Sequence, residues 1–162
     1  LAVDLGFKLY RPLVAGAKWR ADDIVAFAAD GTLRNRAEAT KAELFTYAAT
    51  VRRVVDGDTL VVELEVAPEV RLEIKLRLRG LDCPELATPE GKMAKRLVDG
   101  LVAAGDAVTI TTTKPDKYER YLADVFVTGK AGAEAGEIFL NNTLLERGLA
   151  VRFDGSWAEL SS

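Results

Sequence analysis

The strictest pattern in this chain is an alternation of apolar and charged side chains between residues 71 and 79. The apolar members are Leu72, Ile74, Leu76 and Leu78, and the charged members are Arg71, Glu73, Lys75, Arg77 and Arg79. Successive side chains of a β-strand point to opposite faces, so a period of two predicts a strand with one buried face. The segment therefore belongs to a sheet that is apolar on one side.

Further segments with strand or helix character complete this sheet. The other predicted strands are residues 45–55, 60–66, 107–113 and 121–128. Thr88-Pro89 has the form of a helix start, with a capping hydroxyl and a proline in the first turn. That helix is expected to continue through Leu101 until Gly105 stops it, and a second helix is expected over residues 137–147. Five strands with a helix between the third and the fourth is the order of a small closed barrel of the OB type.

The first 42 residues show a different pattern, with short apolar runs separated by turn residues. Asp30-Gly31 lies between two short apolar runs and predicts a hairpin, and a short helix capped by Asp22 or Asp23 is the alternative. Residues 37–44 could add a helical turn or two. We therefore expect an α+β fold: a five-stranded OB-fold β-barrel with two or three helices over residues 43–155, plus a small N-terminal appendage over residues 1–42. Residues 156–162 are expected to form a polar tail.

The composition removes several classes of chemistry. The 162 residues carry a net charge of −3, contain no histidine, and include Cys83 as the single cysteine. The lack of histidine excludes His-ligated zinc and the Ser-His and Cys-His catalytic pairs. A single cysteine excludes an internal disulfide. Catalysis would have to use carboxylates, arginines, lysines, tyrosines or hydroxyl groups, and the acidic balance argues mildly against tight non-specific binding of nucleic acid.

Sequence patterns give weaker expectations about location and assembly. There is no run of 18 apolar residues, so no membrane-spanning helix is expected. A secretory signal is not visible, which favours a cytoplasmic location. The chain starts at Leu1 rather than at Met, so the sequence leaves open whether another segment precedes it. We expect a monomer, and the sequence leaves an oligomer open.

Charged residues cluster near the predicted ends of two strands. Asp58 follows the tight turn Asp56-Gly57, and Asp82 follows the end of the third strand. Two carboxylates and a nearby carbonyl suit a hard cation such as calcium, which prefers oxygen ligands. Glu85 can face the same pocket, and Arg77 lies five residues before Asp82. A cation with carboxylates and arginines would suit phosphodiester hydrolysis.

Three stretches of the sequence resemble the signature motifs of the staphylococcal nuclease (thermonuclease) family. They are Val55-Asp56-Gly57-Asp58-Thr59, the run from Arg77 to Glu85, and Asp116-Lys117-Tyr118-Glu119-Arg120. Glu146-Arg147-Gly148-Leu149-Ala150 also resembles the end of that domain. The similarity covers residues 44–153, and three motifs in the right order make it highly specific.

The resemblance implies an OB-fold barrel that holds one calcium ion. By position, Asp58 and Asp82 match the carboxylate ligands of the family, and the backbone carbonyl of Cys83 matches a third ligand. The family often has Thr in place of Cys83, but the resemblance requires only its carbonyl. Without a histidine to activate it, Cys83 is a poor nucleophile.

The resemblance also implies roles in catalysis and in substrate binding. Arg77 and Arg120 match the two phosphate-binding arginines, and Glu85 matches the general base or water-positioning residue. Lys117 and Tyr118 match the pair that holds a terminal phosphate. The implied activity is hydrolysis of DNA or RNA with little sequence preference, leaving 3′-phosphates.

Departures from the family pattern leave an alternative open. Glu119 replaces a common Gly and puts an acid beside Arg120, and the base-stacking tyrosines after the last helix have no match. Phe153 and Trp157 are the candidates to replace those tyrosines. Each site residue taken singly also has a structural explanation, such as a turn, a cap or a solvated surface. The alternative function is a non-catalytic or weakly active module that binds nucleic acid or a partner within a larger protein.

Overall fold

The computed structural model describes residues 1–14, 16, 18–36, 44–115, 121–128 and 137–153, with the side chains of residues 113–115 left out. The helices within these ranges are all too short or too polar to cross a membrane.

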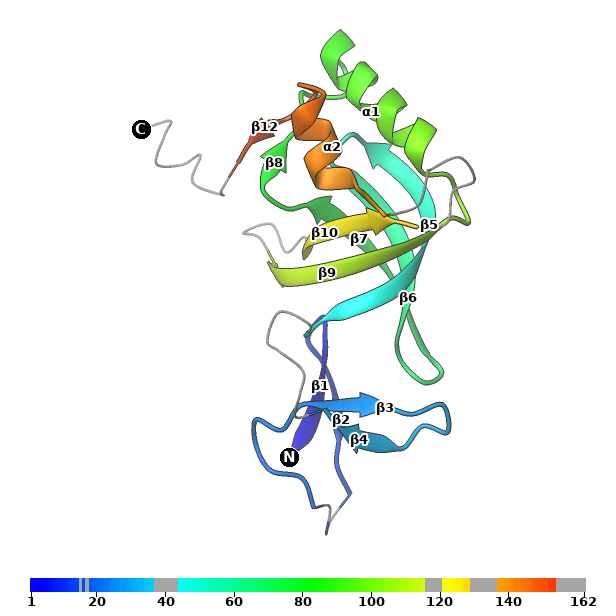
Figure 1. The fold of residues 1–162 in the computed structure, drawn as a ribbon, viewed down its shortest axis with the longest axis vertical. Helices are drawn as coiled ribbons and strands as arrows, with labels where there is room; N and C mark the ends of the chain where they lie inside the picture. The colour runs from blue at the N-terminus through cyan, green and yellow to red at the C-terminus, as the bar shows by residue number, and fades with distance from the viewer. Residues whose placement is uncertain (15, 17, 37–43, 116–120, 129–136, 154–162) are drawn as a thin grey trace.

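The centre of the fold is a closed β-barrel of five strands (Figure 1). These are β5 (Thr46–Asp56), β6 (Thr59–Ala67), β7 (Val70–Leu78), β9 (Ala107–Pro115) and β10 (Tyr121–Val127). They pair in the order β10-β7-β6-β5-β9, and β9 pairs again with β10 to close the barrel. The β10–β7 pairing is parallel and the others are antiparallel. The prediction of an α+β fold built on an OB-type barrel is confirmed.

Two helices and three short strands lie outside the five barrel strands. The helices are α1 (Pro89–Leu101) and α2 (Leu140–Glu146), and the strands are β8 (Leu81–Asp82), β11 (Ile138–Phe139) and β12 (Val151–Arg152). Both helices lie at one end of the barrel, and the N-terminal strands lie at the other (Figure 1). The helix start predicted at Thr88-Pro89 is confirmed, because the Thr88 side chain accepts a hydrogen bond from the N–H of Gly91.

Two predicted helix boundaries were wrong. α1 ends at Leu101, four residues before Gly105, because the backbone of Val102 is already extended and Asp106 Oδ2 accepts a hydrogen bond from the N–H of Ala103. The second helix begins at Leu140 rather than at residue 137. Ile138 and Phe139 form β11 instead, because they pair with the end of β10.

The alternating segment forms β7, and its burial changes along the strand. Leu76 and Leu78 are fully buried in the barrel core, whereas Leu72 and Ile74 are only partly buried. The first half of β7 pairs with β6 in a hairpin that projects away from the helices (Figure 1). The end of β7 is therefore the part that the core fixes most firmly.

Two hairpins form the N-terminal region. One consists of β1 (Ala2–Gly6) and β2 (Leu9–Pro12), and the other consists of β3 (Val25–Phe27) and β4 (Leu33–Asn35). The second confirms the hairpin predicted around Asp30-Gly31, and the alternative of a short helix there is wrong. The helical turns considered over residues 37–44 fall almost wholly outside the described residues.

The first hairpin docks on the barrel through aromatic contacts. The ring of Phe7 lies 5.2 Å from that of Tyr47 and 4.7 Å from that of Tyr121. The hydroxyl of Tyr47 donates a hydrogen bond to the carbonyl of Leu5 at 2.6 Å, and Leu5 joins the same buried cluster as the barrel core. The division of the chain at residue 42 stays a prediction.

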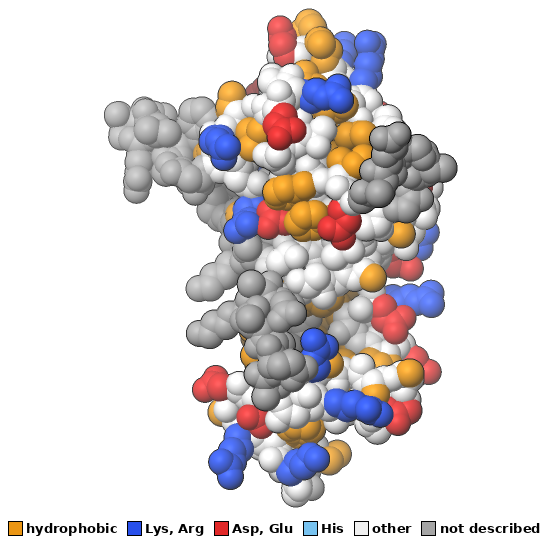
Figure 2. All heavy atoms as spheres, in the orientation of Figure 1, with side chains coloured by type: hydrophobic (Ala, Val, Ile, Leu, Met, Phe, Trp, Pro, Cys, Tyr) orange, Lys and Arg blue, Asp and Glu red, His pale blue; other side chains and the backbone are white. Residues whose placement is uncertain are grey.

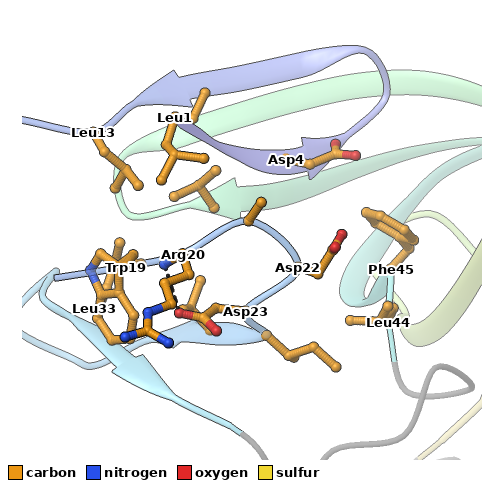
Figure 3. A pocket seen from close by; sticks show the side chains of 15 residues that line it. Leu1, Asp4, Leu13, Trp19, Arg20, Asp22, Asp23, Leu33, Leu44 and Phe45 are labelled. Carbon is orange, nitrogen blue, oxygen red and sulfur yellow. Dashed lines mark hydrogen bonds between the residues drawn. The ribbon is translucent and has the colours of Figure 1, made fainter. Parts of the chain in front are cut away.

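A hollow lies in this N-terminal region. It has a volume of about 680 Å³ and is lined by both hairpins and by Leu44 and Phe45. Figure 3 shows Trp19 and Leu33 on one side of it and Asp4 and Phe45 on the other. Its lining includes none of the predicted site residues, so the candidate chemistry lies elsewhere.

A buried amide fixes α2 against the barrel. Asn141 is 3% exposed, and its Oδ1 accepts a hydrogen bond from the N–H of Val125 at 3.0 Å. Its Nδ2 donates to the carbonyls of Arg79 and Ala123, each at 3.0 Å. One side chain thus satisfies backbone groups at the end of β7 and within β10.

Replacing this amide should destabilise the fold strongly. We expect Asn141→Ala to lower the free energy of unfolding by about 3 kcal/mol or more, because the N–H of Val125 and the carbonyl of Arg79 each lose a hydrogen-bond partner away from bulk water. Asn142→Ala is the matched control, since this half-buried residue makes one solvent-exposed side-chain hydrogen bond among the described residues, to Glu146, and the substitution should cost less than about 0.5 kcal/mol. Urea unfolding measures both, and equal values for the two variants would contradict this assignment.

Candidate active site

The register of two strands places an acid beside an arginine. β6 and β7 pair antiparallel with Thr59 opposite Arg77, and the N–H of Leu78 donates to the carbonyl of Asp58 at 2.8 Å. Asp58 is 8% exposed, at the point where the turn after β5 enters β6. The strand pairing therefore brings Asp58 and Arg77 to the same end of the barrel.

The guanidinium of Arg77 lies between two carboxylates. Its Nη2 is 2.6 Å from Oδ1 of Asp82 and 3.9 Å from Oδ2 of Asp58. The side chain of Arg77 is 12% exposed, whereas that of Asp82 is 35% exposed. The structure thus brings together three of the predicted site residues, and their charges interact where water screens them only in part.

Hydrogen bonds hold the Asp58 carboxylate in its ionised form. Oδ2 accepts from the N–H of Cys83 at 3.0 Å, and Oδ1 accepts from the hydroxyl of Thr59 at 3.1 Å. Burial alone raises the pKa of Asp58, but hydrogen bonds from Asp56 and Cys83 and the charge of Arg77 outweigh it. The pKa of Asp58 is therefore held below its ordinary value.

Asp56 is a site carboxyl that the sequence assigned only to the turn. Its Oδ1 accepts a hydrogen bond from the N–H of Asp58 at 3.2 Å. Burial first, and then the neighbouring Asp58, raise the pKa of Asp56 to about 6. The signal in the sequence was the pair of acids two residues apart on one tight turn, which places two carboxyls close together.

Helix α1 packs tightly against the turn and against the loop after β8. A Cβ added at Gly57 would lie 2.7 Å from Cβ of Ala94 and 2.9 Å from Sγ of Cys83. A Cβ added at Gly91 would lie 2.0 Å from the carbonyl oxygen of Glu85. These two glycines allow three segments to meet with no room for another carbon atom.

Glu85 lies at the edge of this group. Its carbonyl accepts hydrogen bonds from the N–H and from the hydroxyl of Thr88, at 2.9 and 2.6 Å, so its backbone is fixed at the start of α1. Its side chain is exposed. Among the described residues, no hydrogen bond or ion pair joins its carboxylate to Arg77, Asp58 or Asp82. The structure therefore places Glu85 near the site without engaging its carboxylate.

Cys83 contributes its backbone to the site. Its N–H binds Asp58, and its partly buried thiol contacts the region of Gly57. Burial and the carboxylates of Asp58, Asp56 and Asp82 raise the pKa of the Cys83 thiol to about 12. The thiol stays protonated at neutral pH, which agrees with the expectation that Cys83 is no nucleophile.

The third motif falls outside the described residues, and with it Lys117, Tyr118 and Arg120. β10 begins at Tyr121, and its parallel pairing sets Tyr121 opposite Leu76 and Leu122 opposite Arg77. The described start of β10 therefore lies beside the strand that carries Arg77.

The donors at this site fit a hard cation. Asp58 and Asp82 supply carboxylate oxygens near a common point, since both approach the same nitrogen of Arg77. The described residues contain no group of three or more His, Cys, Asp and Glu side chains arranged to hold a metal. Oxygen ligands of this kind suit a hard cation such as calcium rather than zinc.

Comparison with known families agrees with this geometry. The model of the family described as staphylococcal nuclease homologue matches residues 75–159, which is just over half of the chain. The chain belongs to the staphylococcal nuclease family. The match includes Arg77, Asp82 and Glu85.

Curated relatives in this family share part of the chain. An "uncharacterized endonuclease" of Escherichia coli is 36% identical over 76 residues, which is 47% of this chain and 46% of that protein. A "probable staphylococcal-like nuclease" of Oryza sativa subsp. japonica is 32% identical over 76 residues, 47% of this chain and 20% of that protein. An "uncharacterized 38.1 kDa protein" of Capnoides sempervirens is 34% identical, with the same coverage. The matched region thus spans less than half the length of each of these relatives.

The close contact at Gly91 yields a prediction for this nuclease-family site. Gly91→Ala should lower the free energy of unfolding by about 1–3 kcal/mol, because the new Cβ has to push the Glu85 backbone away. Gly100→Ala is the control on the same helix: apart from its chain neighbours and its own helix backbone, no described atom lies within 4 Å of the added Cβ, and Ala favours a helix over Gly by about 1 kcal/mol. Thermal unfolding should show opposite signs, and a stabilising Gly91→Ala would show that the loop is not packed as described.

The raised pKa of Asp56 predicts how stability depends on pH in calcium-free protein. A carboxyl whose pKa is higher in the folded state stabilises the fold below its unfolded pKa of 3.8, and this contribution is lost as the pH rises through about 6. Asp56→Asn should therefore be more stable than the wild type at pH 8, by on the order of 1 kcal/mol after solvent screening. The difference should fade as the pH drops below 6.

Asp30→Asn is the matched control for this titration. Asp30 accepts the same kind of bond, from the N–H of the residue two positions later, but it is exposed and its pKa is lowered. Its substitution should not stabilise the protein at pH 8. Urea unfolding at several pH values measures both variants, and equal pH profiles for Asp56→Asn and the wild type would refute the assigned shift.

Proposed function

We propose that this protein is a calcium-dependent nuclease that hydrolyses phosphodiester bonds of DNA or RNA with little sequence preference. The observation that carries the proposal is the Arg77 guanidinium within 4 Å of two carboxylates at one end of the barrel. Membership of a nuclease family supports it, as do the names of two relatives.

The proposed roles follow from the chemistry of each side chain. Arg77 binds non-bridging phosphate oxygens through its N–H donors and stabilises the negative charge that builds up on them. Asp58, Asp82 and the backbone carbonyl of Cys83 would hold one calcium ion. That ion, when bound, would polarise the phosphate and stabilise the same developing charge.

Glu85 is the proposed general base or water-positioning residue. Its exposed carboxylate can accept a proton from a water molecule while its backbone stays fixed by Thr88. The water oxygen forms the new bond to phosphorus, the bond from phosphorus to the 5′ oxygen breaks, and the 5′ oxygen takes up a proton from solvent water. The products are a 3′-phosphate and a 5′-hydroxyl.

Arg120, Lys117 and Tyr118 are proposed to bind phosphate from the segment before β10. Two facts support this. Their motif stands directly before Tyr121 in the sequence, and the start of β10 pairs with β7 beside Arg77. A second arginine would provide donors for phosphate oxygens that a single guanidinium cannot reach.

The surface charge favours local rather than long-range attraction of the substrate. Figure 2 shows positive and negative side chains interspersed over the face in view, and the chain as a whole carries a net charge of −3. Broad electrostatic attraction of a polyanion would need a basic surface. The proposal therefore assigns phosphate binding to the site residues themselves.

Two substitutions test the proposal directly. Arg77→Gln and Asp58→Asn should each lower cleavage of heat-denatured DNA in millimolar calcium by roughly 10²-fold or more. Arg71→Gln is the matched control, because Arg71 lies on the same strand with a 73% exposed side chain and should retain full activity. Circular dichroism confirms that the variants are folded.

The wild type gives the decisive comparison. Cleavage should stop when a chelator removes calcium and should return when calcium is added back. If the folded wild type cleaves neither DNA nor RNA over hours in calcium, the chain is instead a binding module. Full activity in Arg77→Gln would show that the site has been assigned to the wrong residues.

A further inference from the structure

An aromatic ring covers the central arginine of the site. The guanidinium carbon of Arg77 lies over the ring of Phe153, 5.3 Å from its centroid. Cation–π contacts occur within about 6 Å of the ring centroid, and they strengthen when the cation is shielded from water. The Arg77 side chain is only 12% exposed, so its contact with Phe153 belongs to the stronger cation–π contacts.

The backbone holds Phe153 in place independently of its ring. β12 pairs antiparallel with β8, with Val151 opposite Asp82 and Arg152 opposite Leu81. One residue later, the N–H of Phe153 donates to the carbonyl of Gly80 at 2.9 Å. The segment that carries the ring is thus paired with the strand that carries Asp82.

The ring and the carboxylates hold the guanidinium in different ways. Oδ1 of Asp82 accepts a hydrogen bond from Nη2 of Arg77, and a donor used in that way is not available to a phosphate. A ring face attracts the charge of the guanidinium without taking a particular N–H. The contact with Phe153 can therefore persist while the donors of Arg77 turn to another acceptor.

We propose that Phe153 is a positioning residue, which holds the Arg77 guanidinium over the site so that its N–H donors can bind the scissile phosphate. This inference rests on the proposed nuclease function. It assigns the ring of Phe153 to the arginine rather than to a nucleobase, and Phe153 acts on the reaction only through Arg77.

Ring substitutions test this role. Phe153→Leu keeps an apolar side chain but removes the ring, and it should lower kcat/KM by roughly 3- to 30-fold. Phe153→Trp supplies a better π face and should retain activity close to that of the wild type. Phe139→Leu is the control, since that ring is 37% exposed, stacks on Phe126 at 4.7 Å and makes no ring contact with a site residue in the part of the chain that the structure describes, so activity should stay unchanged. If Phe153→Leu does not fold, Phe153→Met takes its place.

A double-mutant cycle decides whether the ring acts through the arginine. In an Arg77→Gln background, Phe153→Leu should cause no further loss of the residual activity, because no guanidinium is left to position. An equal fold-loss in both backgrounds would mean that the ring contacts the substrate itself, and it would overturn the proposal. Wild-type activity in Phe153→Leu would overturn it as well.

A spectroscopic measurement separates this inference from the proposed function. The Nε–H resonance of Arg77, identified by its loss in Arg77→Gln, should be shifted by the ring current of Phe153. The shift should disappear in Phe153→Leu. If the wild type does not cleave nucleic acid but the shift is present, the proposed function fails and the placement of the ring stands. If the wild type cleaves and the shift is absent, only the positioning role fails.

Discussion

The site depends on one buried positive charge held between two negative charges. Removing charged groups from water costs free energy, and the attraction within a buried ion pair seldom exceeds that cost. A buried ion pair is therefore weak evidence that its residues serve to stabilise the fold. The register of β6 and β7 sets Asp58 beside Arg77, and Asp82 lies 2.6 Å from the same guanidinium. Their presence is better explained by what the three charges can bind than by the stability of the barrel.

Close packing against helix α1 restricts the positions that the segments carrying these charges can take. The turn that carries Asp58 touches α1 at Ala94 because Gly57 has no side chain, and the loop that carries Glu85 touches α1 at Gly91 for the same reason. Protein interiors are dense, so a shift in one of these segments moves the others. Helix α1 thus acts as a support for the turn and the loop, although it carries none of the charged groups assigned to the reaction.

The sequence correctly predicted the elements that depend on residues close together in the chain. The alternation over residues 71–79 predicted β7, and Thr88-Pro89 predicted the start of α1. Both patterns depend only on residues that are neighbours in the chain. β11 was mistaken for helix because its two residues are extended only through pairing with β10. The contact between Phe153 and Arg77 had no local signal either, since it depends on β12 pairing with a strand some 70 residues earlier in the chain.

The balance of charge at the site supports the proposal that a divalent cation takes part in the reaction. Asp58 and Asp82 carry two negative charges, and Arg77 offsets one of them. Asp56, with a pKa of about 6, adds further negative charge at neutral pH. A phosphodiester is itself an anion and would be repelled by the uncompensated carboxylates. One divalent ion bound to oxygen ligands would cancel this excess negative charge, and Arg77 and the ion could then act together on the phosphate.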